Sequence, residues 1–234
     1  MTQFNSVLAL APQFPLASNW EDNILRCFSG VDPLMYLKTT ETKEEEMRDR
    51  LVSLTTGTRL IRGPFKLPSP SPDIDLLVED LDAGILIIAE LKWSRKPGPS
   101  PHERKHRDQE VLKGVSQIGS IRKFIESNPR YLYDRGSVTR FLSSYRDVCY
   151  CVIARDHLVE SPNSECPIFS YDAFNLQLVA HKDTSAVLRS LSNMEWLPEE
   201  GVDFSVDFQG HQVESVAVEL ETYFPPQGPL PFIL

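Results

Sequence analysis

Residues 72–92 constrain the fold of this 234-residue chain more than any other stretch, because they combine two apolar runs with a turn and charged side chains. The pattern predicts strands over 73–79 and 85–93, joined by Asp80-Leu81-Asp82-Ala83-Gly84, whose Asp and Gly residues tolerate the backbone angles of a reversal. The run 85–89 is apolar on both faces, which is typical of a strand covered on both sides. The hairpin is therefore expected at the centre of a sheet.

The spacing of charged residues predicts a cluster at the open end of this hairpin. If the chain reverses symmetrically about the Asp82–Ala83 bond, Asp75 lies opposite Glu90. Directly opposed side chains share a face, about 4.5–5.5 Å apart at Cβ. Lys92 shares the face with Glu90 because side chains alternate along a strand. The three side chains should therefore converge, and a register slip of one residue would separate them.

Two carboxylates side by side repel each other, and burial increases that cost. A divalent cation would compensate, and hard oxygen ligands suit Mg²⁺ or Mn²⁺. A neighbouring lysine can help to activate a water molecule and can stabilise charge that develops on a phosphate. The cluster therefore indicates metal-assisted hydrolysis of a phosphodiester. The alternative is a solvated group of ions on an exposed hairpin, which the apolar run at 85–89 disfavours.

This arrangement resembles the PD-(D/E)XK nuclease superfamily, also called restriction-endonuclease-like, over residues 41–155. Pro72-Asp73 is the literal PD, Asp75 stands where many members carry the metal-binding aspartate, and Glu90-Leu91-Lys92 is the E-x-K half. The resemblance implies an α/β fold with an αβββαβ core and a mixed central sheet. It also implies a nuclease that uses Mg²⁺ or Mn²⁺, with DNA as the expected substrate. Asp75, Glu90 and the Leu91 carbonyl would bind the metal, and Lys92 would activate water.

The resemblance adds Glu44 as an acid that could reach the site from the first core helix. Residues 41–54 read as a helix with Met47 and Leu51 on its apolar stripe, Glu44 on the same stripe and Arg48 turned away. The alternative is that Glu44 belongs to an acidic helix start, which the helix dipole favours.

Gln117 is the second outer candidate, on a helix expected over 110–126. Many superfamily members place a glutamine here as Q-x-x-x-Y, where it would support a phosphate or a water molecule. This chain has Ile121 in place of the tyrosine. The alternative is a polar residue on a partly exposed helix.

Residues 94–110 read as a Pro-rich basic loop that could follow a phosphate backbone, or as an ordinary surface loop. Its basic residues are Arg95, Lys96, Arg104, Lys105 and Arg107. The net charge of −9 argues against a dedicated nucleic-acid-binding module and less against an enzyme with local positive charge. The rival interpretation is a catalytically silent member of the fold, acting as a scaffold or nucleic-acid-binding module.

The remaining sequence predicts an N-terminal helical extension over 1–40, the nuclease-like domain over 41–180 and a C-terminal region over 181–234. That last region should contain a helix and a β-hairpin turning at Gln209-Gly210-His211, with a Pro-rich tail after it. The hairpin is a candidate surface for a homodimer or a partner protein. No apolar run approaches the ~20 residues of a membrane span, so we expect a cytoplasmic protein without a membrane partner.

Overall fold

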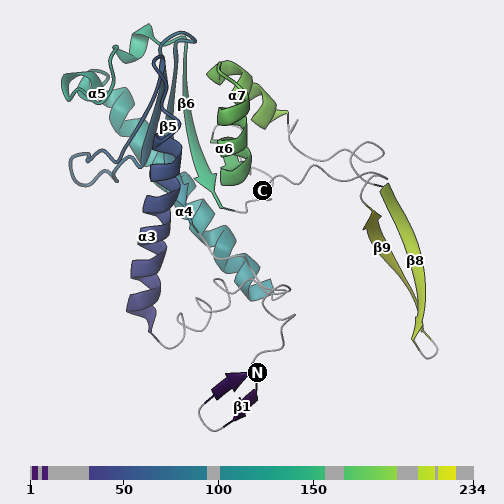
Figure 1. Cartoon of the computed structure of the whole chain (residues 1–234). Coiled ribbons are helices and arrows are strands. Elements are labelled where there is room, and N and C mark those ends of the chain that lie inside the picture. The colour runs from purple at the N-terminus through teal and green to yellow at the C-terminus, as the bar shows by residue number, and fades with distance from the viewer. Residues whose placement is uncertain are drawn as a thin grey trace. The chain divides into compact units, whose positions relative to one another are not determined.

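The computed structural model of the chain describes residues 2–4, 7–9, 32–93, 101–155, 166–193, 205–213 and 216–224 (Figure 1). The chain divides into two compact units, Met1–Arg189 and Ser190–Leu234. The helices described include none with the length and apolarity that a membrane crossing needs.

A five-stranded mixed sheet forms the centre of the first unit. Its strands lie in the order β3-β4-β5-β6-β7. The pairs β3–β4 and β4–β5 are antiparallel, whereas β5–β6 and β6–β7 are parallel. The bounds are β3 Arg59–Arg62, β4 Leu76–Asp80, β5 Ile85–Lys92, β6 Asp147–Ala154 and β7 Ile168–Ser170. Every residue of β5 except Lys92 is buried, which confirms the prediction of a central strand.

The predicted register of the β4–β5 hairpin is confirmed. Leu76 pairs with Ala89 and Asp80 pairs with Ile85, so the next position outward sets Asp75 opposite Glu90. The Asp80 carboxylate accepts hydrogen bonds from the backbone N–H groups of Asp82 and Ala83, at 3.1 and 2.8 Å, and so stabilises the turn. Gly84 closes the turn with φ of 66°, an angle that favours glycine.

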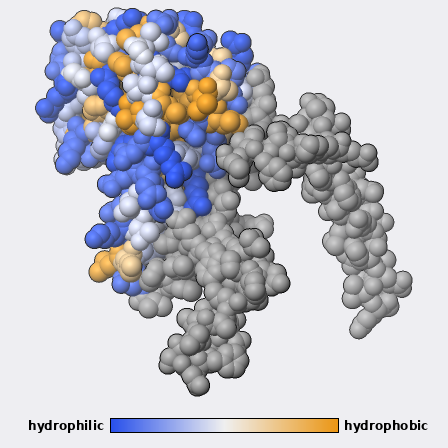
Figure 2. Space-filling view, in the orientation of Figure 1, coloured by the Kyte–Doolittle hydropathy of each residue, from blue (hydrophilic) through white to orange (hydrophobic). Residues whose placement is uncertain are grey.

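Helix α3, Pro33–Val52, begins earlier than the helix expected over 41–54 and runs continuously across residues 40 and 41. Asp32 caps it by accepting a hydrogen bond from Met35 N at 3.0 Å, and proline suits the first helical position. Thr39 and Thr40 lie within the helix, and both hydroxyls donate to carbonyl oxygens of the preceding turn. Figure 2 shows the projecting part of α3 as largely hydrophilic, with an apolar start where Leu34, Met35 and Leu37 are exposed.

Helix α4, Pro101–Ser127, is also longer than expected. The prediction of a loop over 94–110 is wrong for residues 101–110, which form the first turns of this helix. Proline is compatible with a helix start, and residues 102–110 contain neither proline nor glycine. Ile118, Ile121 and Ile125 pack in one hydrophobic core with residues of β4, β5 and β6 such as Leu77 and Ile88. Helix α4 therefore covers one face of the sheet.

The connection between α6, Tyr171–Ala180, and α7, Thr184–Ser192, meets the opposite face. Arg59 and Asp80 pair across the β3–β4 ladder, so their side chains share a face. The Arg59 guanidinium donates to the carbonyl oxygens of Leu178 and His181, at 2.6 and 2.8 Å. Asp80 accepts a hydrogen bond from Thr184 N at 3.0 Å. The sheet is thus enclosed between helices.

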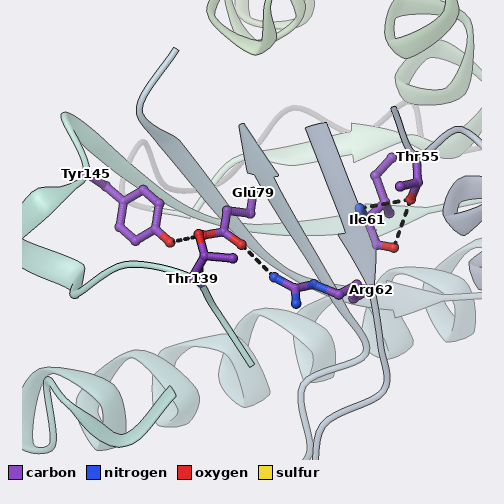
Figure 3. Close-up of polar contacts among 6 residues, drawn as sticks. All are labelled: Thr55, Ile61, Arg62, Glu79, Thr139 and Tyr145. Carbon is purple, nitrogen blue, oxygen red and sulfur yellow. Dashed lines mark hydrogen bonds and ion pairs between the residues drawn. The ribbon is translucent and has the colours of Figure 1, made fainter. Parts of the chain in front are cut away.

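A fully buried carboxylate, Glu79, ties the segment between α4 and β6 to the sheet (Figure 3). This segment holds α5, Tyr131–Asp134, and the short 3-10 helix η1, Leu142–Ser144. Glu79 Oε1 accepts hydrogen bonds from the N–H and hydroxyl of Thr139, at 2.8 and 2.5 Å, and from the Tyr145 hydroxyl. Its Oε2 pairs with Arg62 Nη2 at 2.5 Å. These partners compensate the cost of burying the charge.

Two further hairpins lie outside the central sheet. Strands β1, Thr2–Phe4, and β2, Val7–Ala9, form one, so these residues of the helical extension expected over 1–40 are strand, and residues 10–31 of that extension lie outside the described residues. Strands β8, Ser205–Val213, and β9, Val216–Phe224, form the other. The turn predicted at 209–211 is wrong, because Gly210 pairs with Glu219 inside the ladder and the reversal lies between Val213 and Val216. A glycine can remain within a strand when the pairing on both sides continues.

Candidate carboxylate–lysine site

Three of the predicted site residues meet at the carboxyl end of β5. The Asp75 carboxylate accepts a hydrogen bond from Leu91 N at 2.9 Å, and Lys92 Nζ pairs with Glu90 Oε1 at 2.6 Å. Gly63 follows β3 and lies against the Asp75 backbone, since a Cβ atom at Gly63 would overlap with the Asp75 carbonyl oxygen. A side chain at that position would therefore displace Asp75 from the site.

Glu90 is the most deeply buried member of the site, with only 2% of its surface exposed. Burial and the neighbouring Asp75 carboxylate raise the pKa of Glu90 to about 7, although Lys92 opposes the shift. Glu90 Oε2 is buried without a hydrogen-bond partner in the part of the chain that the structure describes. A buried carboxylate oxygen without a donor is costly, which is the condition that a bound cation would relieve.

Asp75 is half-buried, and burial also raises its pKa. The hydrogen bond from Leu91 N and the positive charges of Lys92 and Arg48 reduce this shift without reversing it. Both carboxyl groups therefore hold a proton more strongly than exposed carboxyl groups do.

Lys92 lies beneath helix α4, at the point where Gly114 faces the sheet. A Cβ atom at Gly114 would lie 3.1 Å from Lys92 Cγ, 3.2 Å from its Cε and 3.3 Å from Val152 Cγ1. Burial disfavours the charged form of Lys92, but Glu90 and the other nearby carboxylates outweigh it and raise the pKa of Lys92. The side chain is therefore an ammonium ion at neutral pH.

Glu44 reaches this site from α3, as predicted. Its Oε1 accepts a hydrogen bond from Trp93 N at 3.0 Å, directly after β5. Burial raises the pKa of Glu44, and the charges of Lys92 and Asp75 also act on it. Glu44 thus joins α3 to the end of the central strand. Arg155 contacts the same end of the strand: its N–H donates to the Lys92 carbonyl at 3.0 Å, and its guanidinium lies over the Trp93 ring.

Arg48 is a residue of this site that the sequence interpretation missed, because it was expected to turn away. It follows Glu44 by four residues on α3 and its charge acts on Asp75. The i, i+4 spacing from Glu44 was the available signal, because such residues lie on the same face of a helix.

Gln117 does not join the cluster through any hydrogen bond. It lies one turn beyond Gly114 on α4, and its buried Oε1 has no hydrogen-bond partner among the residues described. Its assigned role in supporting water or a phosphate stays a prediction.

The structure places the predicted basic residues unevenly. Arg95 and Lys96 lie outside the described residues, whereas Arg104, Lys105 and Arg107 belong to the first turns of α4. Lys105 is exposed there. From residue 101 onward, the segment predicted to be a basic loop is therefore helix.

The site brings together the carboxylates of Asp75 and Glu90, without a complete protein cage for a metal among the described residues. Within the described ranges, no group of three or more His, Cys, Asp or Glu residues could hold a metal ion. Mg²⁺ is commonly bound by one or two carboxylates and keeps several waters, so Asp75, Glu90 and the Leu91 carbonyl fit that chemistry. Glu90 Oε2 lacks a donor among the described residues, and either a bound cation or a proton shared with the neighbouring Asp75 carboxyl group would satisfy it.

Comparison of the chain with known proteins found no matching protein-family model, no matching curated protein and no matching solved structure.

Proposed function

We propose that this chain is a metal-dependent nuclease of the PD-(D/E)XK type, which hydrolyses phosphodiester bonds, with DNA as the expected substrate. The observation that supports it best is the cluster of the buried Glu90 with the half-buried Asp75 and Lys92 at the end of a central strand, with Glu90 Oε2 lacking a donor among the described residues. The element order α3-β3-β4-β5-α4-β6 supports an αβββαβ core of the restriction-endonuclease type.

Asp75, Glu90 and the Leu91 carbonyl would bind the metal. A bound Mg²⁺ or Mn²⁺ would supply positive charge that activates water and neutralises a phosphate. The hydrogen bond from Leu91 N fixes the Asp75 carboxylate in position.

Lys92 would orient and activate the attacking water and would stabilise negative charge on the phosphate. Its raised pKa makes it a hydrogen-bond donor in the metal-free protein, because a lysine that keeps its proton cannot accept another. Its contribution is therefore electrostatic and orienting.

The test is cleavage of supercoiled plasmid and linear DNA with Mg²⁺, Mn²⁺ or EDTA. The wild type is compared with Lys92→Ala and with the control Lys113→Ala, which removes an exposed lysine of α4. We expect cleavage that requires metal, falls at least about 100-fold in Lys92→Ala and persists in Lys113→Ala, since loss of one electrostatic group typically costs 10²–10³ in rate.

Equal cleavage by the wild type and Lys92→Ala would reject the assigned site and indicate another nuclease in the preparation. A wild type that neither cleaves DNA nor binds Mn²⁺ would reject the catalytic function altogether.

The rival function, a silent fold that serves as a scaffold or nucleic-acid-binding module, has one observation in its favour. Lys92 is paired with Glu90 Oε1, and within the described residues no third protein side chain completes a set of metal ligands. Calorimetric titration with Mn²⁺ separates the two functions. Binding that disappears in Asp75→Ala is expected of the nuclease, whereas no binding by either protein is expected of the silent module.

A further inference from the structure

Helix α3 is held against the end of β5 by contacts that fix which face it presents. Glu44 Oε1 accepts a hydrogen bond from Trp93 N, and the Met47 carbonyl accepts one from the Tyr171 hydroxyl at 3.4 Å. Met47 and Leu51 are buried, with 5% and 0% of their surfaces exposed. The helix therefore cannot rotate without breaking these contacts.

Arg48 lies on the face that these contacts direct toward the site. It follows Glu44 by one helical turn and is half-buried, and its positive charge acts on Asp75. No hydrogen bond or ion pair within 4.0 Å joins its guanidinium to another described residue. The other cationic side chain of the site, Lys92, is already paired with Glu90.

The negative charge of the cluster favours a second cationic side chain beside Lys92 during phosphodiester hydrolysis. Among the described side chains, the carboxylates of Glu44, Asp75 and Glu90 outnumber the cations Lys92 and Arg48 by one when all are ionised, and Glu110 adds a further negative charge that acts on Glu44. A divalent cation would offset this excess of negative charge, whereas a bound phosphodiester group would restore part of it. Without Arg48, the site would stay negative where further negative charge develops during phosphodiester hydrolysis.

We propose that Arg48 is a catalytic residue that binds a non-bridging oxygen of the scissile phosphate. Arginine suits this role because its planar guanidinium offers paired donors to a phosphate and keeps its charge at any relevant pH. Arg48 makes or breaks no covalent bond in this assignment; it holds the phosphate and neutralises its charge. The inference rests on the proposed nuclease function, because it assigns a substrate group to the same site.

The experiment measures kcat and KM for Mg²⁺-dependent plasmid cleavage by the wild type, Arg48→Ala and Arg48→Lys. The control is Lys38→Ala, which removes one exposed positive charge from the same helix, ten residues earlier. We expect Arg48→Ala to lower kcat and kcat/KM together by about 100-fold, which is the signature of an interaction made in the transition state. Arg48→Lys should lose less, and Lys38→Ala should match the wild type.

Two readouts separate this role from a structural one. Added guanidinium ion, at millimolar concentrations, should partly restore cleavage by Arg48→Ala, and calorimetric Mn²⁺ affinity should change less than about threefold because Arg48 is not a metal ligand. An active wild type with an equally active Arg48→Ala variant would overturn this inference alone. An inactive wild type would overturn the proposed function and this inference with it, and loss of Mn²⁺ binding in Arg48→Ala would reassign the residue to support of Asp75.

Discussion

The Glu90 carboxyl group is buried, and its neighbours are the Asp75 carboxyl group and the ammonium group of Lys92. Its pKa is about 7 in the folded protein and near 4.5 in an unfolded chain. Between these values the folded state binds more protons than the unfolded state, so the free energy of unfolding falls as pH rises. Asp75 and Glu44, whose pKa values are also raised, act in the same direction.

We therefore predict that the metal-free protein loses stability between about pH 5 and pH 8. Glu90→Gln should show a shallower slope, because the glutamine does not titrate while Asp75 and Glu44 still do. Lys92 does not contribute within this window, since its raised pKa lies above it. The measurement is urea denaturation in EDTA at pH 5, 6, 7 and 8. Identical slopes for the two proteins would contradict the assignment of the titration to Glu90.

The residues of the site differ in how far the sequence could predict them. Asp75, Glu90 and Lys92 followed from strand alternation and a symmetric turn, which fix a register from local pattern alone. Arg48 was missed because the helix was assigned by its apolar residues, whereas its rotation is fixed by a contact between Glu44 and Trp93 that are far apart in sequence. Glu79 is similar: its complete burial depends on Arg62, Thr139 and Tyr145, from three separate segments.

At the scale of helices and strands, the close approach of α4 to β5 depends on a glycine, Gly114, which has no side chain. Gly114 leaves room for the Lys92 stem, and a Cβ atom there would lie at 3.1–3.3 Å from Lys92 and Val152. Lys92 is the flexible partner and would have to move. A shift of the Lys92 stem by a few tenths of an ångström would disturb the geometry in which its ammonium group pairs with Glu90 at 2.6 Å.

We predict that Gly114→Ala lowers metal-dependent cleavage by about 10-fold or more, while stability changes little. Alanine favours a helix interior by about 1 kcal/mol relative to glycine, which offsets part of the crowding. The matched control is Gly119→Ala on the same helix, because a Cβ atom there meets nothing within 4 Å. That variant should be equally or more stable and fully active. Equal activity of the two variants would show that Lys92 tolerates displacement.

The extents of the elements were predicted less well than their order. The prolines of residues 94–101 suggested that a loop continued to residue 110, yet the polar residues after Pro101 form helix. Gly210 suggested a turn, yet pairing on both sides keeps it within β8. Glycine and proline permit a break without requiring one, so tertiary pairing decides where an element ends.

At the scale of the whole molecule, the candidate site and the five-stranded sheet belong to the unit Met1–Arg189. Helix α7 begins in this unit, and its Val187 is buried with 0% of its surface exposed. Thr184, at its start, also bonds to Asp80 at the end of β4. A chain that ends after Asn193 therefore keeps every described contact of α7 with the sheet.

We predict that residues 1–193 unfold cooperatively, with a urea midpoint close to that of the full chain, and retain metal-dependent cleavage. A chain that ends after Ala180 should be less stable by several kcal/mol, because burying one Val or Leu side chain contributes about 1.5–3 kcal/mol and the bond to Asp80 is also lost. Urea denaturation and plasmid cleavage, measured side by side, test both chains. If residues 1–193 fold but no longer cleave DNA, the β8–β9 unit contributes to the activity, and sedimentation of the full chain would then show whether it does so by joining two copies.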